Sequence, residues 1–181
     1  MSTSKPYRVM FQDEAGFGRI NKPKRCWCPK GCRPAVPCQH IREYTYAYAA
    51  VSPHDGQMVS LILPQTNAVC MNIFLQETSC RFPDEQISLI MDKAAWHTAK
   101  ILKIPDNIEI FPLLPYSPEL NPTEQIWDEV REKEFKNEAF NSLSLVENRL
   151  CDTLADLEND PRRVQSITGW DWIVSVCLIA D

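Results

Sequence analysis

The pattern of apolar and polar residues predicts five short β-strands. In the first, "YRVMFQD", every second residue from Tyr7 to Asp13 falls on one face, which is the period of a strand. The segments "EYTYAYAAV" and "MVSLILP" are rich in β-forming residues and flank the turn "SPHDGQ", so together with the first strand they suggest a meander. "QISLIMD" has a buried-strand pattern that ends in Asp92, and "IEIFPL" is a further strand.

Two segments show the spacing of helices. "TNAVCMNIFLQETSCRF" places Val69, Ile73 and Phe74 on one side, which predicts that this side is buried. A second helix is predicted to start at Asn121 and to run through "PTEQIWDEVREKEF".

A third helix is predicted from a run of apolar residues at helical spacing, with Ser144 and Glu147 placed as a capping box. The apolar residues are Leu143, Val146, Leu150, Leu154 and Leu157. Strands come first, strand and helix then alternate, and helices follow. This order predicts an α/β layered domain with a mixed sheet flanked by helices, and a helical C-terminal part at about 121–168.

The length of 181 residues predicts a single domain, 1–181, with a sizeable core. We find no run of about 18 apolar residues, so no membrane span is expected. The N-terminus "MSTSKPYRVMFQDE" lacks the apolar middle of a signal peptide. The eight cysteines are therefore expected to be thiols in a reducing cytoplasm.

The net charge of −5 conceals an asymmetry. Residues 1–42 carry nine Lys/Arg and two Asp/Glu, whereas residues 43–181 carry ten and 22. A Pro-rich, Cys-rich loop at about 18–42 holds much of this positive charge around an aromatic residue. Its candidate DNA-binding residues are Lys22, Lys24, Arg25, Trp27, Lys30 and Arg33. Basic residues around an aromatic can hold a phosphate backbone and stack on a base, although from charge alone a solvated loop is the favoured interpretation.

Four cysteines of this loop invite a zinc interpretation. Cys26, Cys28, Cys32 and Cys38 lie within 13 residues. Their spacing lacks the paired C-x₂-C of structural zinc sites, so chance thiols in a loop are the favoured interpretation. Trp127, like the other tryptophans of the second half of the chain, is expected to pack in the core.

Three carboxylates stand at predicted element ends. Asp13 and Asp92 are expected to close strands, and Glu124 lies in the first turn of a helix. Carboxylates brought together repel one another unless a cation lies between them, and oxygen ligands suit Mg²⁺ or Mn²⁺. Simple alternatives exist for each: the aspartates fit turns, and Glu124 fits the N3 position of a capping box that starts at Asn121.

The motifs "DEAGFGRI", "MDKAAWH" and "LPYSPELNPTEQIW" resemble the DDE transposases of the mariner superfamily, in particular their bacterial insertion-sequence relatives. The resemblance covers about residues 7–175. It implies an RNase H-like fold, two Mg²⁺ or Mn²⁺ ions and a DNA strand-transfer reaction. It assigns the catalytic and metal-binding roles to Asp13, Asp92 and Glu124, and leaves Glu119 to the turn. Asp128, one helical turn beyond Glu124, is the fallback third ligand.

The resemblance also predicts partners and marks two departures. DNA is the expected partner, a homodimer on DNA is the expected assembly, and a bacterial nucleoid is the expected location. Such transposases usually carry an N-terminal helix-turn-helix region, which we expect to be absent here. Lys93 stands where relatives have a small or amide residue, and it could contact a phosphate or weaken metal binding by repulsion. His97 is a candidate for orienting a phosphate or for proton transfer, and equally for a helix-start residue with a local hydrogen bond. The alternatives are a nuclease without strand transfer and a non-catalytic remnant that binds DNA or an intact transposase.

Overall fold

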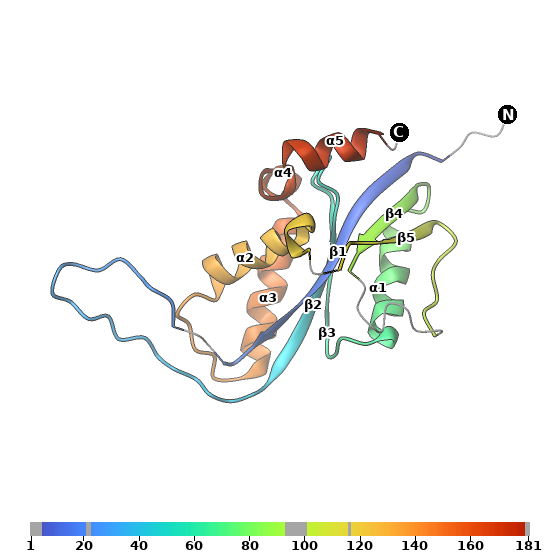
Figure 1. The fold of residues 1–181 in the computed structure, drawn as a ribbon. Helices are drawn as coiled ribbons and strands as arrows, with labels where there is room; N and C mark the ends of the chain where they lie inside the picture. Colours follow the sequence, from blue (N-terminus) through green and yellow to red (C-terminus); the bar gives the residue numbers. More distant parts are fainter. Residues whose placement is uncertain (1–4, 21–22, 93–100, 116, 180–181) are drawn as a thin grey trace.

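A computed structural model describes residues 5–20, 23–92, 101–115 and 117–179. Within these ranges a mixed five-stranded sheet has the order β3-β2-β1-β4-β5 (Figure 1). The strands β1 (Tyr7–Gly18), β2 (Tyr44–Val51) and β3 (Met58–Leu63) form the predicted antiparallel meander. The strands β4 (Gln86–Met91) and β5 (Ile108–Pro112) join the other edge of β1 in parallel.

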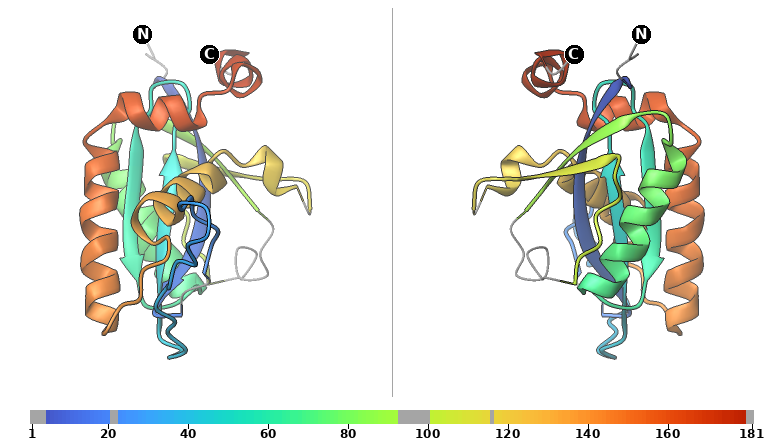
Figure 2. Two further views of the ribbon diagram at one scale, coloured as in Figure 1. Left: turned by 90° about the vertical axis from the view of Figure 1, so that its left-hand side faces the viewer. Right: turned by 90° about the vertical axis from the view of Figure 1, so that its right-hand side faces the viewer.

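Helices cover both faces of the sheet (Figures 1 and 2). The helix α1 (Ala68–Arg81) lies on one face. The helices α2 (Thr123–Glu134) and α3 (Leu143–Glu158) lie on the other. Two more, α4 (Pro161–Thr168) and α5 (Asp171–Ile179), follow at one end of the sheet, and α5 was missed in the sequence analysis. No helix among the described residues has the length and apolar character needed to cross a membrane.

The side chains of β1 alternate between two separate hydrophobic cores, one on each face of the sheet. Phe11, Ala15 and Phe17 point into a core shared with α2 and α3, while Met10 belongs to the core under α1. Successive side chains of a strand point to opposite faces, so one strand serves both layers. The predicted apolar stripe of α3 faces the first core, with Val146, Leu150, Leu154 and Leu157 all buried, as expected.

Several local predictions were wrong. The buried face of α1 is formed by Met71, Phe74 and Leu75, while Val69 and Ile73 are exposed, because α1 covers the sheet through a different stripe from the one expected. The N-cap of α3 is Ser142, whose hydroxyl accepts from the Leu145 amide, and not Ser144. The first strand runs five residues beyond Asp13, because β2 continues to pair with it up to Gly18.

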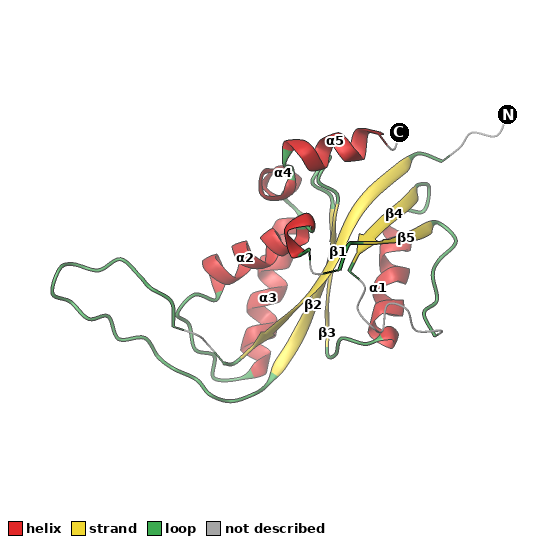
Figure 3. Cartoon of the chain, in the orientation of Figure 1, coloured by secondary structure: helices red, strands yellow, loops and turns green. Residues whose placement is uncertain are grey.

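The loop between β1 and β2 projects from the body as a long arm (Figure 3). We call residues 19–43 the arm. As predicted, its described residues form no helix or strand. Its base is closed by the Arg19 amide, which donates to the Glu43 carbonyl over 3.1 Å.

Candidate active site

Strand register brings the two aspartates level with each other. Asp13 pairs with Ala49 of β2 on one side. On the other side the last parallel pair between β1 and β4 is Phe11 with Ile90. Two residues further along both strands lie Asp13 and Asp92, the latter directly after β4. Asp13 is therefore a mid-strand residue that stands where its parallel neighbour ends, which is the kind of sheet edge where open α/β sheets bind ligands.

The start of α2 is tied to the same part of β1. The buried Asn121 side chain donates from Nδ2 to the Gln12 carbonyl over 2.9 Å. The buried Thr123 hydroxyl donates to the Phe11 carbonyl over 2.7 Å. These two bonds reach the carbonyls of the two residues before Asp13 and hold the first turn of α2, including Glu124, beside it.

A further bond from α2 orients Asp13 itself. The indole Nε1 of Trp127, one turn after Glu124, donates to Asp13 Oδ2 over 2.9 Å. Trp127 is fully buried, which confirms its predicted place in the core. The indole thus fixes one carboxylate oxygen of Asp13. Asn121, Thr123 and this role of Trp127 were not foreseen, although all three lie within or next to the "NPTE" motif.

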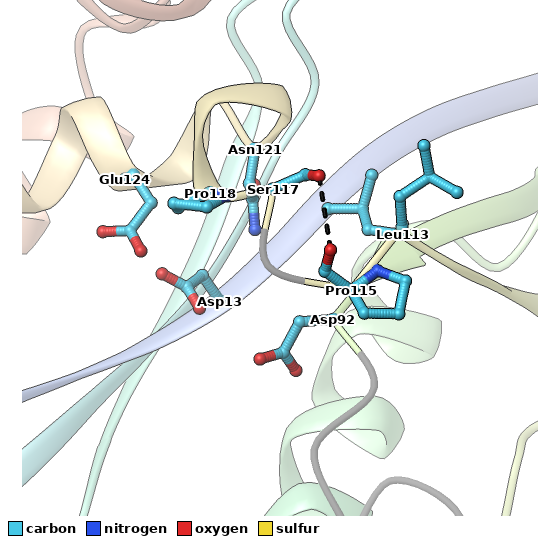
Figure 4. A pocket seen from close by; sticks show the side chains of 9 residues that line it. Asp13, Asp92, Leu113, Pro115, Ser117, Pro118, Asn121 and Glu124 are labelled. Atoms are coloured by element: carbon cyan, nitrogen blue, oxygen red, sulfur yellow. Dashed lines mark hydrogen bonds between the residues drawn. The ribbon is translucent and has the colours of Figure 1, made fainter.

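The three predicted acids line one pocket of about 470 Å³. Figure 4 shows the carboxylates of Asp13 and Glu124 close to each other, with Asp92 entering from the end of β4. The rest of the wall comes from the segment between β5 and α2. Its residues are Leu113, Leu114, Pro115, Ser117, Pro118 and Asn121. The structure thus brings together residues that are 79 and 32 positions apart in the chain.

Burial and mutual repulsion make Asp13 and Glu124 reluctant to ionise. Burial raises the pKa of Asp13 to about 8, and the charges of Glu124 and Glu14 add to this. The pKa of Glu124 is also raised, first by burial and then by Asp128 and Asp92, against an opposing effect of Arg131. A bound cation would remove the repulsion and favour the ionised forms.

The donor set fits a hard divalent cation, but it is not closed into a cage. Carboxylate oxygens around a pocket that disfavours negative charge are suitable ligands for Mg²⁺ or Mn²⁺. In the part of the chain that the structure describes, no three Asp, Glu, His or Cys side chains are grouped closely enough to form a ready-made metal site. Mg²⁺ commonly keeps several waters and takes only one or two protein carboxylates, so such a cage is not required.

The structure tests the capping-box interpretation of Glu124. The helix begins one residue later than expected, with Pro122 at the N-cap and no side-chain capping bond there. Glu124 is then the second residue of α2 rather than N3, and the Asn121 side chain donates to β1 through Nδ2 while its Oδ1 accepts from the Thr123 amide. The capping-box interpretation was wrong. Glu119, in the short 3₁₀ helix Pro118–Leu120, and Asp128 are exposed, and neither lines the pocket.

The predicted DNA-binding residues fall into two groups. Lys24, Arg25, Trp27, Lys30 and Arg33 all lie exposed on the arm. Lys24 is the anchored one, since its ammonium pairs with Glu132 at 3.1 Å and its backbone exchanges hydrogen bonds with Asn137. Lys22, Lys93 and His97 lie outside the described residues, so their roles stay predictions.

The arm cysteines behave as separate thiols. Cys26, Cys28, Cys32 and Cys38 are exposed and unpaired with one another by disulfides. Cys28 donates to the Cys32 carbonyl, and Cys38 contacts His40. Since no metal-binding group of His, Cys, Asp and Glu is found within the described residues, nothing here supports a zinc site.

With this geometry in place, comparisons define the class of the protein. Residues 8–147 match the model of the DDE superfamily endonucleases, so the chain belongs to this family. It is 33% identical over 130 residues to the uncharacterized protein y4pE/y4sA of Sinorhizobium fredii (strain NBRC 101917 / NGR234), covering 71% of this chain and 96% of that protein.

Solved structures confirm the predicted RNase H-like fold. The Mos1 mariner paired-end complex with Mn aligns with a TM-score of 0.62 and 17% identity, over 93% of this chain and 55% of that chain. The Mos1 strand transfer complex aligns with a TM-score of 0.61 and 18% identity, over 93% and 54%. The chain therefore spans about 55% of the Mos1 transposase chain. Likeness at this identity establishes the shared fold.

Proposed function

We propose that this chain is the catalytic domain of a DDE transposase. It would hydrolyse phosphodiester bonds at transposon ends and join the freed 3′-hydroxyls to target DNA. The observation that supports this most is the gathering of Asp13, Asp92 and Glu124 in one pocket where burial raises the pKa of Asp13. Membership of the endonuclease family agrees with it. Residues 1–181 would form one such domain, acting on DNA at the bacterial nucleoid.

In this proposal Asp13, Asp92 and Glu124 would hold two Mg²⁺ or Mn²⁺ ions. Such ions would activate the attacking oxygen and stabilise the leaving oxygen. Trp127 keeps Asp13 in place, and the bonds of Asn121 and Thr123 to β1 hold Glu124 opposite to it. In hydrolysis, water attacks the phosphorus at the transposon end and the bond to the 3′-oxygen breaks, which frees a 3′-hydroxyl. That hydroxyl then attacks a target phosphate and displaces the 3′-oxygen of the neighbouring nucleotide.

The arm supplies the DNA contacts in this proposal. Its exposed cations, among them Arg25, Lys30 and Arg33, are placed to meet phosphates, and its Trp27 side chain is fully exposed for stacking. Joining two ends calls for two active sites, so a homodimer on DNA is the proposed assembly. A strand-transfer assay on paired ends separates this activity from that of a nuclease that only cuts.

The substitution Glu124→Gln tests the proposal, with Glu119→Gln as the matched control. Both remove one charge from the same stretch, but only Glu124 lines the pocket. We expect Glu124→Gln to lower Mg²⁺-dependent nicking of supercoiled DNA by about 100-fold or more, because an amide is a poor Mg²⁺ ligand. The melting temperature should stay the same or rise, since a repelling charge leaves the pocket. Nicking that survives Glu124→Gln would refute the assignment, as would an equal loss in Glu119→Gln.

A further inference from the structure

A second pocket, of about 420 Å³, lies between the base of the arm and the end of α2. We call it the flanking pocket. Its walls come from the end of β1, the arm base and the segment from α2 to Phe140, and they combine aromatic rings with cations. The lining residues include Phe17, Lys24, Tyr44, Arg131, Phe135 and Lys136. None of these residues belongs to the three-acid pocket.

The cations of the flanking pocket are only partly neutralised. Lys24 and Lys136 both pair with the single carboxylate of Glu132. Glu138, an acid of the pocket wall, pairs with Arg149 at 3.5 Å. Arg131 has no carboxylate partner among the described residues, and its guanidinium lies 5.4 Å from the centre of the Phe17 ring. Positive charge therefore remains for an anion.

An exposed aromatic ring closes the arm side of the pocket. Tyr44, the β2 partner of Gly18, is 42% exposed, whereas Phe17, the β1 residue before Gly18, points to the other face of the sheet and is buried in the core. The ring lies tightly against β1, since a Cβ on Gly18 would come within 2.5 Å of Tyr44 Cδ1. Arg19 braces the same place by pairing with Glu43 and donating to the Phe140 carbonyl. A fixed, half-exposed ring beside cations is the arrangement on which an unpaired base can stack.

The flanking pocket and the three-acid pocket each take a residue from α2. Arg131 is seven positions after Glu124, which places it on the same side of α2 and about 10 Å further along the helix. Its charge already acts on Glu124, whose pKa it lowers against the effect of burial. At the roughly 3.4 Å rise of a strand in duplex DNA, the separation corresponds to about three nucleotides, and a more extended single strand spans it with fewer.

We propose that the flanking pocket binds a nucleotide of the single strand that leaves the active site, about three positions from the cleaved bond. Arg131 and Lys24 contact its phosphate, and the base stacks on Tyr44. The choice of DNA as ligand rests on the proposed transposase function. The residues and their roles rest on the charge and ring geometry described above.

The test uses a fluorescein-labelled 12-nucleotide oligothymidylate and the full chain in EDTA, so that no cleavage occurs. Arg131→Gln should weaken binding about tenfold at 100 mM NaCl and reduce the salt slope by about 0.7. Tyr44→Ala should weaken it about tenfold through lost stacking, and Tyr44→Phe should restore it. The matched control is Lys133→Gln, because Lys133 is exposed on α2 and lines neither pocket.

An abasic oligonucleotide of the same length completes the test. It should bind the wild-type chain about as weakly as oligothymidylate binds Tyr44→Ala, and Tyr44→Ala should weaken it no further. The proposal is overturned if Lys133→Gln matches Arg131→Gln, if Tyr44→Phe fails to restore binding, or if the abasic strand binds as well as oligothymidylate. Separately, a wild-type chain that binds the oligonucleotide in this way but never nicks DNA with Mg²⁺ would refute the proposed transposase activity and leave the flanking pocket standing.

Discussion

At the scale of single residues, the carboxylate of Asp13 is held in an unfavourable place. Burial and the neighbouring acids raise its pKa to about 8, while Trp127 donates to one of its oxygens. An aspartate in an unfolded chain has a pKa near 4. The folded protein without metal therefore binds a proton between about pH 4 and pH 8 that the unfolded chain has released. It follows that Asp13 lowers the stability of the metal-free protein as the pH rises through this range.

The substitution Asp13→Asn should accordingly stabilise the metal-free protein at pH 8.5. Asparagine carries no charge at any pH and can still accept the Trp127 hydrogen bond through its carbonyl. We expect a gain of roughly 1–3 kcal/mol in unfolding free energy, or about 3–8 °C in melting temperature, and almost none at pH 4. Thermal melts in EDTA at the two pH values measure this. Asp84→Asn, at an exposed position, is the control, and a less stable Asp13→Asn at pH 8.5 would contradict the expectation.

At the scale of elements, the key contact is the attachment of α2 to β1. Asn121 and Thr123 each use a side chain to reach a backbone carbonyl more than 100 residues away in sequence. Both bonds are buried, and both come from residues just before Glu124, so they fix the helix turn that holds Glu124 beside Asp13. The proline-rich stretch before α2 forms part of the wall of the active-site pocket and leads directly into the helix.

Removing the Thr123 hydroxyl should therefore affect activity more than stability. Thr123→Val deletes the donor to Phe11 and should cost about 1–2 kcal/mol of unfolding free energy. A shift of Glu124 should lower Mg²⁺-dependent nicking by roughly tenfold or more, because catalytic groups tolerate little displacement. Thr123→Ser keeps the donor and should retain most of the activity.

Thr153→Val is the matched control for this experiment. The Thr153 hydroxyl also donates to a backbone carbonyl, that of Arg149, but it lies within α3 and away from the pocket. Its loss should cost similar stability and leave nicking unchanged. If Thr153→Val reduced nicking as much as Thr123→Val, the effect would be one of general stability, and the positioning role would be wrong.

At the scale of the whole molecule, sequence patterns predicted the layers better than the ends of the elements. The mixed sheet, the meander and the buried stripe of α3 follow from local periodicity. The length of β1 does not, because "EAGFG" has little strand character and is held by pairing with β2. The buried face of α1 was not predicted correctly either. Apolar residues lie around much of this helix, and packing against the sheet determines which of them are buried.

In the candidate site, the acids were predicted from the sequence, whereas the residues that position them were not. Asp13, Asp92 and Glu124 were identified through motifs and resemblance, and the structure places them around one pocket. The residues that position these acids were not predicted. The hydrogen bonds of Asn121, Thr123 and Trp127 join residues that are 109–114 positions apart in the sequence. Long-range contacts of this kind leave no local pattern in a single sequence.

Binding of Mn²⁺ to the wild-type chain, followed by the electron paramagnetic resonance of free Mn²⁺, tests the three-acid site most directly. At pH 8.5 and millimolar metal, about two ions per chain should bind, with Glu119→Gln equal to wild type and Asp13→Asn strongly impaired. Affinity should fall toward pH 6.5, because Asp13 must release its proton to bind metal. A wild-type chain that binds no Mn²⁺ under these conditions, or an Asp13→Asn variant that binds as well as wild type, would contradict the proposed site.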